Sequence, residues 1–134
     1  MKTKIKKTYY PNGKLFSETP YVNDKIHGIR KFYYKNSNIE FKIPYKNGIR
    51  HGVRKSYYKN SNLEYEIPYK NGKIHGIKKD YYDNGKLCSE AFFINNEING
   101  LLKQYCPKKN ILSGLLLYNN DIKNGIKINL RWMK

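Results

Sequence analysis

Apolar and polar residues alternate in two eight-residue stretches of the chain, at 39–46 and 63–70. In the first stretch one set is Ile39, Phe41, Ile43 and Tyr45, and the other is Glu40, Lys42, Pro44 and Lys46. In the second, Leu63, Tyr65, Ile67 and Tyr69 alternate with Glu64, Glu66, Pro68 and Lys70. A period of two residues places successive side chains on opposite sides of an extended backbone. Each stretch therefore predicts a β-strand with one buried face.

Turn signals flank these strands. The first signal is Asn12-Gly13, Asn36-Ser37, Asn60-Ser61 and Asn84-Gly85. The second is Asn47-Gly48 and Asn71-Gly72, with weaker copies at Asn23-Asp24, Asn95-Asn96 and Asn119-Asn120. Asn-Gly tolerates the positive φ angles of a tight hairpin turn. Two strands and two turns leave no room for a helix within one unit.

The strands and turns recur with a period of 24 residues. The repeat is visible in four columns: glycines at 28, 52, 76 and 100, tyrosine pairs beginning at 9, 33, 57 and 81, apolar residues at 15, 39, 63, 87 and 111, and asparagines at 23, 47, 71, 95 and 119. We expect an all-β fold, an elongated single antiparallel sheet of tandem β-hairpins in which each unit packs on its neighbours. We place the units at 4–27, 28–51, 52–75, 76–99 and 100–134 of a single domain, with the last as a C-terminal cap.

The pattern leaves the cross-strand register open. Loops of two and of three residues give opposite facing for the tyrosine pairs, although one tyrosine of each pair faces the apolar side with either loop. Pro44 and Pro68 belong to the polar sets of their strands. Because proline cannot donate to a ladder, they predict a local bulge or an unpaired strand end.

The two ends of the chain depart from the repeat. Lys2, Lys4, Lys6 and Lys7 predict a first strand that is protected from pairing with another chain. The last unit has an apolar excess in Leu115–Leu117 and again from Ile126 to Trp132. This excess closes the end of the sheet or forms a dimer contact, and we favour the cap.

The amino-acid composition indicates the net charge of the protein and the cellular compartment in which we expect it. The chain has 27 Lys and Arg against 10 Asp and Glu, a formal net charge of +17, and 14 tyrosines. The charge favours acidic partners, but Lys, Asn, Ile and Tyr share A/T-rich codons, so a low-GC genome is an equal explanation. Amphipathic tyrosine suits a thin sheet. Cys88 and Cys106 form no disulfide framework, and with no signal peptide and no membrane-spanning run we expect a cytoplasmic protein if Met1 is the natural start.

Two sets of residues are candidates for partner binding. The basic pairs are Arg30-Lys31, Arg54-Lys55 and Lys78-Lys79, and we expect one column of each pair on each side of the sheet. Such a ladder of cations attracts anionic lipid, tracks a nucleic-acid backbone, or keeps a solvated face soluble. The tyrosines Tyr34, Tyr58 and Tyr82 line a groove or hold the sheet together through cross-strand pairs.

Metal binding and catalysis are disfavoured. His27, His51 and His75 recur in register, but strands lie ~4.8 Å apart, so these residues are separated by roughly 10 Å. Zinc–nitrogen bonds are ~2.0–2.1 Å, so the three imidazoles cannot converge on one ion, and we interpret them as turn residues. Glu18, Glu66 and Glu90 likewise share one column and are spread along the sheet. We predict no enzyme activity, no metal and no cofactor.

The repeat unit, G-x-x-x-x-Y-Y-x-N-G/S-x-L/I-x-x-E-x-x-Y-x-N-G-x-x-H-G, resembles the MORN repeat variant of bacterial proteins of the YwqK family. The residues that carry the resemblance are Tyr34, Asn36, Ile39, Tyr45, Asn47, Gly48 and Gly52, with their equivalents one period away. The resemblance implies a hairpin sheet with a grooved face, contact with proteins or membranes, and the role of a toxin–antitoxin antitoxin component. The pattern fails at Lys4, which replaces the first glycine, and at Asn99-Gly100, which replaces His-Gly.

These observations favour a binding module over an enzyme. The leading expectation is a protein–protein module that presents a repeated face to an acidic partner, such as a toxin. The alternative is a peripheral binder of anionic lipid or phosphoinositide through the basic ladder. A structural, self-associating element is a third class, and nucleic-acid binding is the least favoured.

Overall fold

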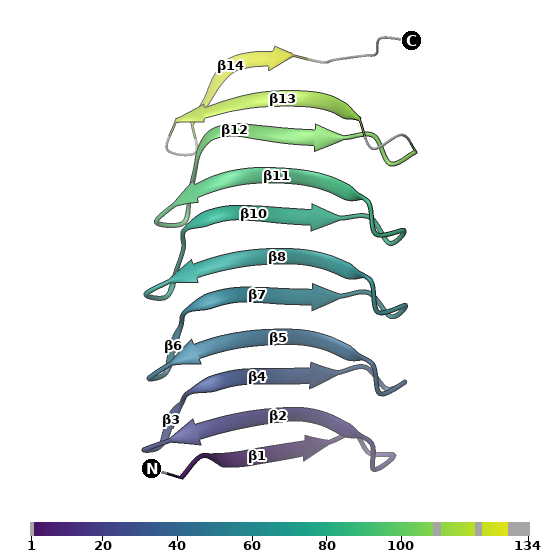
Figure 1. The fold of residues 1–134 in the computed structure, drawn as a ribbon, viewed down its shortest axis with the longest axis vertical. Coiled ribbons are helices and arrows are strands. Elements are labelled where there is room, and N and C mark those ends of the chain that lie inside the picture. The colour runs from purple at the N-terminus through teal and green to yellow at the C-terminus, as the bar shows by residue number, and fades with distance from the viewer. Residues whose placement is uncertain (1, 109–110, 120–121, 129–134) are drawn as a thin grey trace.

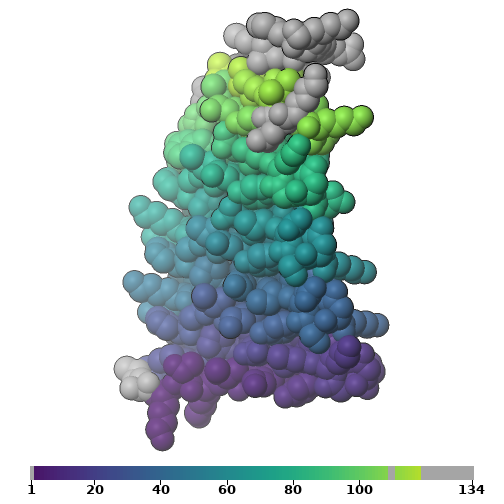
Figure 2. Space-filling model, turned by 45° about the vertical axis from the view of Figure 1, so that its right-hand side comes forward, coloured from purple at the N-terminus to yellow at the C-terminus, as the bar shows by residue number. Residues whose placement is uncertain are grey.

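The chain forms one open antiparallel sheet, and residues 2–108, 111–119 and 122–128 are described in a computed structural model. Fourteen strands and no helix occur in these residues. The strands stack in sequence order along the long axis of the molecule, so that the N-terminal and C-terminal strands lie at opposite ends (Figure 1). The space-filling view shows the same succession of units from one end to the other (Figure 2). The predicted fold class is confirmed.

The long strands run along a single path through the sheet. They are β1 (Lys4–Tyr9), β2 (Leu15–Val22), β4 (Gly28–Tyr33), β5 (Ile39–Lys46), β7 (Gly52–Tyr57), β8 (Leu63–Lys70), β10 (Gly76–Tyr81), β11 (Leu87–Ile94), β12 (Glu97–Tyr105), β13 (Leu112–Asn119) and β14 (Ile122–Ile128). Three two-residue strands lie off this path: β3 (Lys25–Ile26), β6 (Ile49–Arg50) and β9 (Lys73–Ile74) pair with β2, β5 and β8. Each of the first three units thus supplies one six-residue strand, one eight-residue strand and a two-residue return strand, whereas the nine-residue β12 takes up the return after β11.

Both predicted turn signals form hairpin turns. At the first, Ser37 has a φ of 72°, and the backbone N–H of Tyr34 donates to the carbonyl of Asn38 at 2.8 Å. At the second, Asn47 and Gly48 have φ angles of 50° and 81°. Two successive positive φ angles match the right-handed twist of the flanking strands, which explains why this turn is asparagine followed by glycine.

A bulge interrupts each hairpin and corrects the predicted alternation. Phe32 pairs with Phe41 whereas Tyr33 pairs with Ile39, so Glu40 is an extra residue in β5. Equivalent register shifts occur in the hairpins β1–β2, β7–β8, β10–β11 and β12–β13. Ile39 therefore shares a face with Tyr33, and not with Phe41 as the strict period of two predicts. A bulge inserts one residue and shifts the alternation on one side of it.

The prolines lie where the pairing of a strand changes from one partner to the next. Along β5, Phe41 and Lys42 pair with β7, whereas Tyr45 and Lys46 pair with β6. Pro44 falls between, and its carbonyl accepts the N–H of His51 at 3.1 Å. Pro44 also keeps its regular pairing with Ile29 on the other side, so it lies within β5, at a break between two pairing partners, and not at the unpaired strand end that is one of the two predictions.

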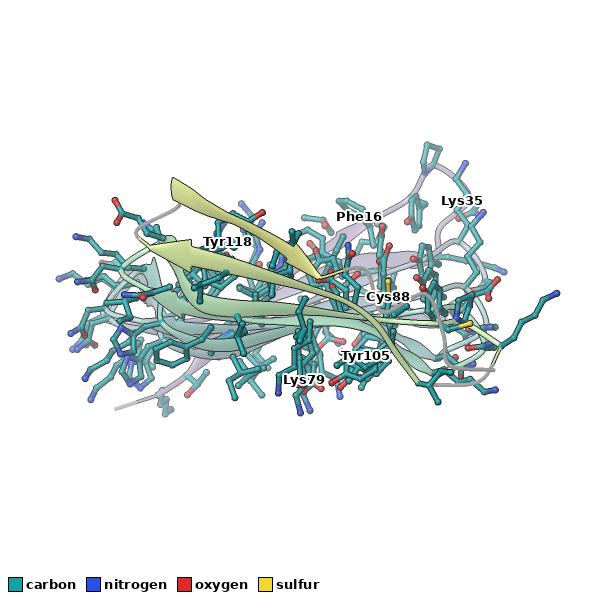
Figure 3. All side chains as sticks on the ribbon, turned by 90° about the horizontal axis from the view of Figure 1, so that it is seen from above. Phe16, Lys35, Lys79, Cys88, Tyr105 and Tyr118 are labelled. Carbon is teal, nitrogen blue, oxygen red and sulfur yellow. The ribbon has the colours of Figure 1, made fainter. Side chains whose placement is uncertain are left out.

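The sheet is a single layer with little enclosed core. In the described residues the buried hydrophobic side chains are Ile43 and Ala91, each 6% exposed, and Ser56 is fully buried. Phe16 and Tyr118 project from one side of the sheet, and Lys79 and Tyr105 from the other (Figure 3). Stability must therefore come from cross-strand pairs and hydrogen bonds more than from a central core.

The ends of the sheet differ. At the N-terminal edge, β1 carries the exposed lysines Lys4, Lys6 and Lys7, as predicted. At the other end, Leu115, Leu116 and Leu117 lie in β13 and pair with β12. Trp132 lies outside the described residues, so the choice between a cap and a dimer contact stays a prediction.

Candidate functional site

The nine candidate residues fall into three sets. We call one side of the sheet the arginine face; it carries Arg30, Phe32, Phe41, Arg54, Tyr65 and Lys78. We call the other side the lysine face; it carries Lys31, Lys42, Lys55, Glu66 and Lys79. The third set, Tyr34, Tyr58 and Tyr82, follows the ends of β4, β7 and β10 at the turns. Each basic pair therefore sends one cation to each side, and the structure gathers the nine residues at no common point.

The turn tyrosines join neighbouring units. The hydroxyl of Tyr34 donates to the carbonyl of Tyr57 at 2.6 Å, that of Tyr58 to the carbonyl of Tyr81 at 2.6 Å, and that of Tyr82 to the carbonyl of Tyr105 at 2.9 Å. Burial raises the pKa of Tyr34 and of Tyr58 above its usual value. These hydroxyls are engaged within the fold, which favours the structural interpretation of this column.

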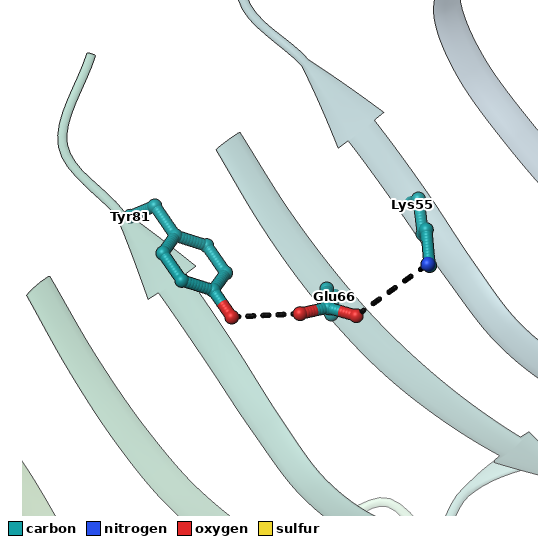
Figure 4. Close-up of polar contacts among 3 residues, drawn as sticks. All are labelled: Lys55, Glu66 and Tyr81. Atoms are coloured by element: carbon teal, nitrogen blue, oxygen red, sulfur yellow. Dashed lines mark hydrogen bonds and ion pairs between the residues drawn. The ribbon is translucent and has the colours of Figure 1, made fainter. Parts of the chain in front are cut away.

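On the lysine face, a row of lysines and glutamates crosses the sheet. Glu66 of β8 accepts a hydrogen bond from Tyr81 of β10 at 2.7 Å and lies 3.9 Å from the Nζ of Lys55 of β7 (Figure 4). Burial, followed by the hydrogen bond to Glu66, raises the pKa of Tyr81 to about 12. Glu18 and Glu90 accept equivalent bonds from Tyr33 and Tyr105. The carboxylates are thus held apart in separate units, as their column predicts.

Lys42 interrupts this row. It occupies the position of Glu18 and Glu66, and it pairs with Lys31 on one side and Lys55 on the other. Three lysines on consecutive strands form a local concentration of positive charge. The Nζ of Lys42 lies 5.8 Å from the centre of the Tyr57 ring, in place of the hydrogen bond that a carboxylate accepts in other units.

A row of exposed aliphatic side chains runs beside the lysines. Ile29, Val53 and Ile77 are 49%, 43% and 53% exposed, and Ile5 and Leu101 continue the row. Ile29 and Val53 pair with Pro44 and Pro68. Large apolar side chains that recur in register on one side of a sheet form a patch of the kind that marks interaction surfaces.

The aliphatic row is hollowed near its C-terminal end. Pro44 packs on Gly52, where an added Cβ would lie 3.1 Å from the proline Cγ, but Gly100 has nothing within 4 Å of that position. Phe92 replaces the proline in this unit and pairs with Ile77. A cavity of about 350 Å³ results, lined by Ile77, Phe92 and Leu101 among others.

The arginine face carries aromatic rings. Phe16, Phe32 and Phe41 contact one another edge to face, with ring centres 5.6 and 6.1 Å apart. The guanidinium carbon of Arg30 lies 4.6 Å from the Phe32 centre, and that of Arg54 lies 5.1 Å from the Phe41 centre. Together these side chains line much of a groove of about 470 Å³.

Two guanidinium groups in this groove have incomplete hydrogen bonding. The Nε atoms of Arg30 and Arg54 are buried and have no hydrogen-bond partner in the described part of the chain. By contrast, Arg50 donates to the hydroxyl of Tyr69 at 3.3 Å, and a hydrogen bond with Tyr45 raises the pKa of the Arg50 guanidinium. A buried donor without a partner costs about 1–3 kcal/mol, so an added acceptor would stabilise Arg30 and Arg54.

Sequence reasoning missed three features of these faces. The contact among the rings of Phe16, Phe32 and Phe41 is not predicted by strict alternation. Phe16 reaches the face of Phe32 only because the bulge shifts the alternation in its strand. The aliphatic row was also missed, although its residues follow each glycine of the repeat and the period alone would have found them. The charge change at Lys42 is visible in the sequence as the departure of one column from glutamate.

The histidines are held apart by the turns. The Nδ1 atoms of His27 and His51 accept the backbone N–H of Asn47 and Asn71 at 3.2 and 3.5 Å. His75 lies edge to face with Phe92, with ring centres 6.5 Å apart. In the described residues no group of three or more His, Cys, Asp or Glu side chains is placed to hold a metal ion. No helix there has the length and apolar character required to span a bilayer.

Comparison with known families decides what kind of repeat this is. The family described as "MORN repeat variant" matches four segments, 2–23, 26–47, 50–71 and 74–95, which together make up more than half of the chain. The chain belongs to the MORN repeat variant family. Each matched MORN repeat contains one bulged hairpin of the sheet. MORN repeats are generally non-enzymatic binding modules. No curated protein matches the chain.

Proposed function

We propose that this MORN repeat chain is a binding module that docks an acidic protein surface against its lysine face. The observation that carries the proposal is the exposed aliphatic row beside the lysines. Ile29, Val53 and Ile77 are about half exposed and recur at the same position of successive units. A partner that covers this row removes their apolar surface from water, which favours binding by roughly 25 cal/mol per Å² of apolar surface buried.

The charge of the lysine face supports an acidic partner. The row across the strands contains Lys7, Lys31, Lys42, Lys55, Lys79 and Lys103 against Glu18, Glu66 and Glu90. Complementary charge around an apolar centre increases the association rate and excludes wrong partners. The resemblance to the YwqK family makes a toxin with an acidic surface one candidate for this partner.

An anionic membrane is the second candidate. The same aliphatic side chains would enter the headgroup region, and each lysine near the surface would contribute about 1 kcal/mol. Flotation with vesicles of neutral phosphatidylcholine, with and without phosphatidylserine, separates the two functions. Salt-sensitive flotation with the anionic vesicles alone would favour the membrane and count against the protein partner.

Affinity capture with matched triple variants tests the protein partner. The variant K31Q/K55Q/K79Q neutralises the lysine face, and R30Q/R54Q/K78Q makes the same charge change on the opposite side. We expect a partner cross-linked to the wild-type chain in the cells that express it to be lost with the lysine variant and kept with the arginine variant. The proposal is rejected if no cross-linked protein is lost with the lysine variant.

A further inference from the structure

The arginine face has two cations whose hydrogen bonding the fold leaves incomplete. The guanidinium group of Arg30 is stacked over Phe32, and that of Arg54 is 5.1 Å from Phe41 and 5.5 Å from Tyr65. Within the described residues no carboxylate forms an ion pair with either arginine, whereas Lys78 in the equivalent position lies 3.8 Å from Asp80. Neither Nε atom would lose a hydrogen bond within the chain if its guanidinium group rotated toward a ligand. Both arginines are thus suited to bind an anion from outside the chain.

The spacing of the two arginines restricts the ligand. Arg30 lies in β4 and Arg54 in β7, with only β5 between them. Two strand spacings amount to about 9.6 Å along the long axis of the sheet. A polyproline II helix has three residues per turn and a rise of ~3.1 Å, so every third side chain points the same way at about 9.3 Å intervals. In a β-strand, residues three apart point to opposite sides.

The aromatic rings lie along the same direction. Phe16, Phe32 and Phe41 come from β2, β4 and β5, so their edge-to-face contacts follow the long axis across three strands. Aromatic-lined grooves are the usual platform for polyproline II segments. The guanidinium fork matches a carboxylate in two parallel hydrogen bonds. The rings and the two arginines therefore lie along one direction of the sheet, and the spacing of the arginines is close to the three-residue repeat of a polyproline II segment.

We propose that the groove of the arginine face binds an acidic polyproline II segment of another protein. The segment runs along the long axis and presents a carboxylate at every third residue. Two such carboxylates bind Arg30 and Arg54, and the intervening residues pack on Phe16, Phe32 and Phe41. This site lies on the opposite side of the sheet from the lysine face, so the two proposals stand or fall separately.

Fluorescence anisotropy with labelled peptides tests the spacing. The probe is the dodecapeptide (Glu-Pro-Pro)₄, and the control has the same composition with the four glutamates in one block. At 150 mM salt we expect the periodic peptide to bind at least tenfold more tightly than the block peptide. Equal affinity of the two peptides, or no binding of the periodic one, would overturn the proposal. Tighter binding of a helical peptide with glutamates seven residues apart would also overturn it.

Matched variants test the residues. R30Q and R54Q should each weaken binding of the periodic peptide at least fivefold, whereas K31Q and K55Q, adjacent in sequence but on the lysine face, should change it less than twofold. R54K, which keeps the charge and loses the fork, should bind with intermediate affinity, and circular dichroism checks that each variant keeps its β-structure. An equal loss in the lysine variants would show that net charge alone attracts the peptide and would reject the site.

Discussion

At the scale of single residues, one repeat position changes the electrostatics of a whole face. Glu18, Glu66 and Glu90 each lie beside lysines of neighbouring strands and accept a tyrosine hydroxyl. Lys42 occupies the same position in the unit 28–51, where it faces Lys31 and Lys55. Like charges directly opposite one another destabilise a strand pair. The unit therefore gives up some stability, and it gains a concentration of positive charge on the proposed docking surface.

Restoring the carboxylate should stabilise the protein. In K42E, the introduced carboxylate would pair with Lys31 and Lys55 and accept a hydrogen bond from the hydroxyl of Tyr57. We expect the free energy of unfolding, measured with urea, to rise by about 0.5–1 kcal/mol. K46E makes the same charge change on an exposed side chain outside the row and should raise it less. An equal gain in both variants would attribute the effect to net charge.

The tyrosines of the lysine face predict a dependence on alkaline pH. Burial, followed by hydrogen bonding to Glu18 or Glu66, raises the pKa of Tyr33 and of Tyr81 to about 12 from an ordinary value of 10.0. The folded state holds these protons more tightly than the unfolded state. Their contribution to stability is therefore complete below pH 10 and is lost as the pH rises from 10 toward 12.

Y81F tests this dependence. The variant should be less stable than the wild type at pH 8, and the difference in the free energy of unfolding should shrink as the pH approaches 11.5. Tyr9 is 59% exposed, so Y9F provides a control for removal of a tyrosine hydroxyl that lies in solvent, and it should change the stability at pH 8 less than Y81F does. A difference between Y81F and the wild type that stays constant with pH would contradict the assignment.

At the scale of the structural element, the bulged hairpin is only partly readable from the sequence. The period of 24 residues, the asparagine turns and the strands follow from side-chain type, because positive φ angles and alternation leave direct traces. The bulge at Glu40 leaves none, since no special residue is required there, and the predicted facing of Ile39 fails for that reason. The acceptor of the Tyr58 hydroxyl is a backbone carbonyl of the next unit, which side-chain patterns do not reveal.

The tyrosine hydroxyls at the turns should contribute to coupling between units. Y58F removes the 2.6 Å hydrogen bond to the carbonyl of Tyr81. We expect a loss of about 0.5–1.5 kcal/mol in the free energy of unfolding. Because Tyr34 makes the equivalent bond one unit earlier, Y34F/Y58F should lose close to the sum of the two single variants. A stability unchanged in either single variant would show that solvent replaces the bond without cost.

The contact between glycine and proline should be sensitive to a single methyl group. Gly52 has a φ of 113°, and a Cβ there would lie 3.1 Å from the Cγ of Pro44. Gly48 also has a positive φ, 81°, but nothing within 4 Å of the added atom. Thermal and urea unfolding should show G52A to be less stable than G48A by at least about 1 kcal/mol.

A double variant separates strain from contact. In G52A/P44A the new methyl group no longer meets the proline Cγ at 3.1 Å, but the contact with the Cβ of residue 44 at 3.3 Å and the strained φ remain. Part of the stability lost in G52A should therefore return. If G52A and G52A/P44A are equally unstable, the contact with the proline Cγ does not explain the glycine.

At the scale of the whole molecule, each described unit contacts its neighbours through the pairing of adjacent strands. The sheet order is sequential, and no described strand bridges distant units. Stability in such an array is approximately a sum of unit terms and neighbour terms. Removing one complete unit should therefore preserve the rest of the sheet.

A matched pair of deletions tests this independence. Deleting residues 40–63 removes 24 residues and joins Ile39 to Glu64, which keeps the bulge and the facing of every later strand. We expect far-ultraviolet circular dichroism typical of β-structure and cooperative unfolding with a smaller urea m-value. Deleting residues 40–62 leaves one extra residue, which moves the next strand to the opposite facing. That variant should lose cooperative unfolding, and similar behaviour of the two deletions would refute the strict register.

The stacking direction has an evolutionary consequence. Each internal duplication of 24 residues would lengthen both faces by two strand spacings, about 10 Å. The new copy would bring its own cations and side chains without altering those already present. The number of repeats would therefore set both the length of the binding faces and the number of equivalent binding positions that they carry.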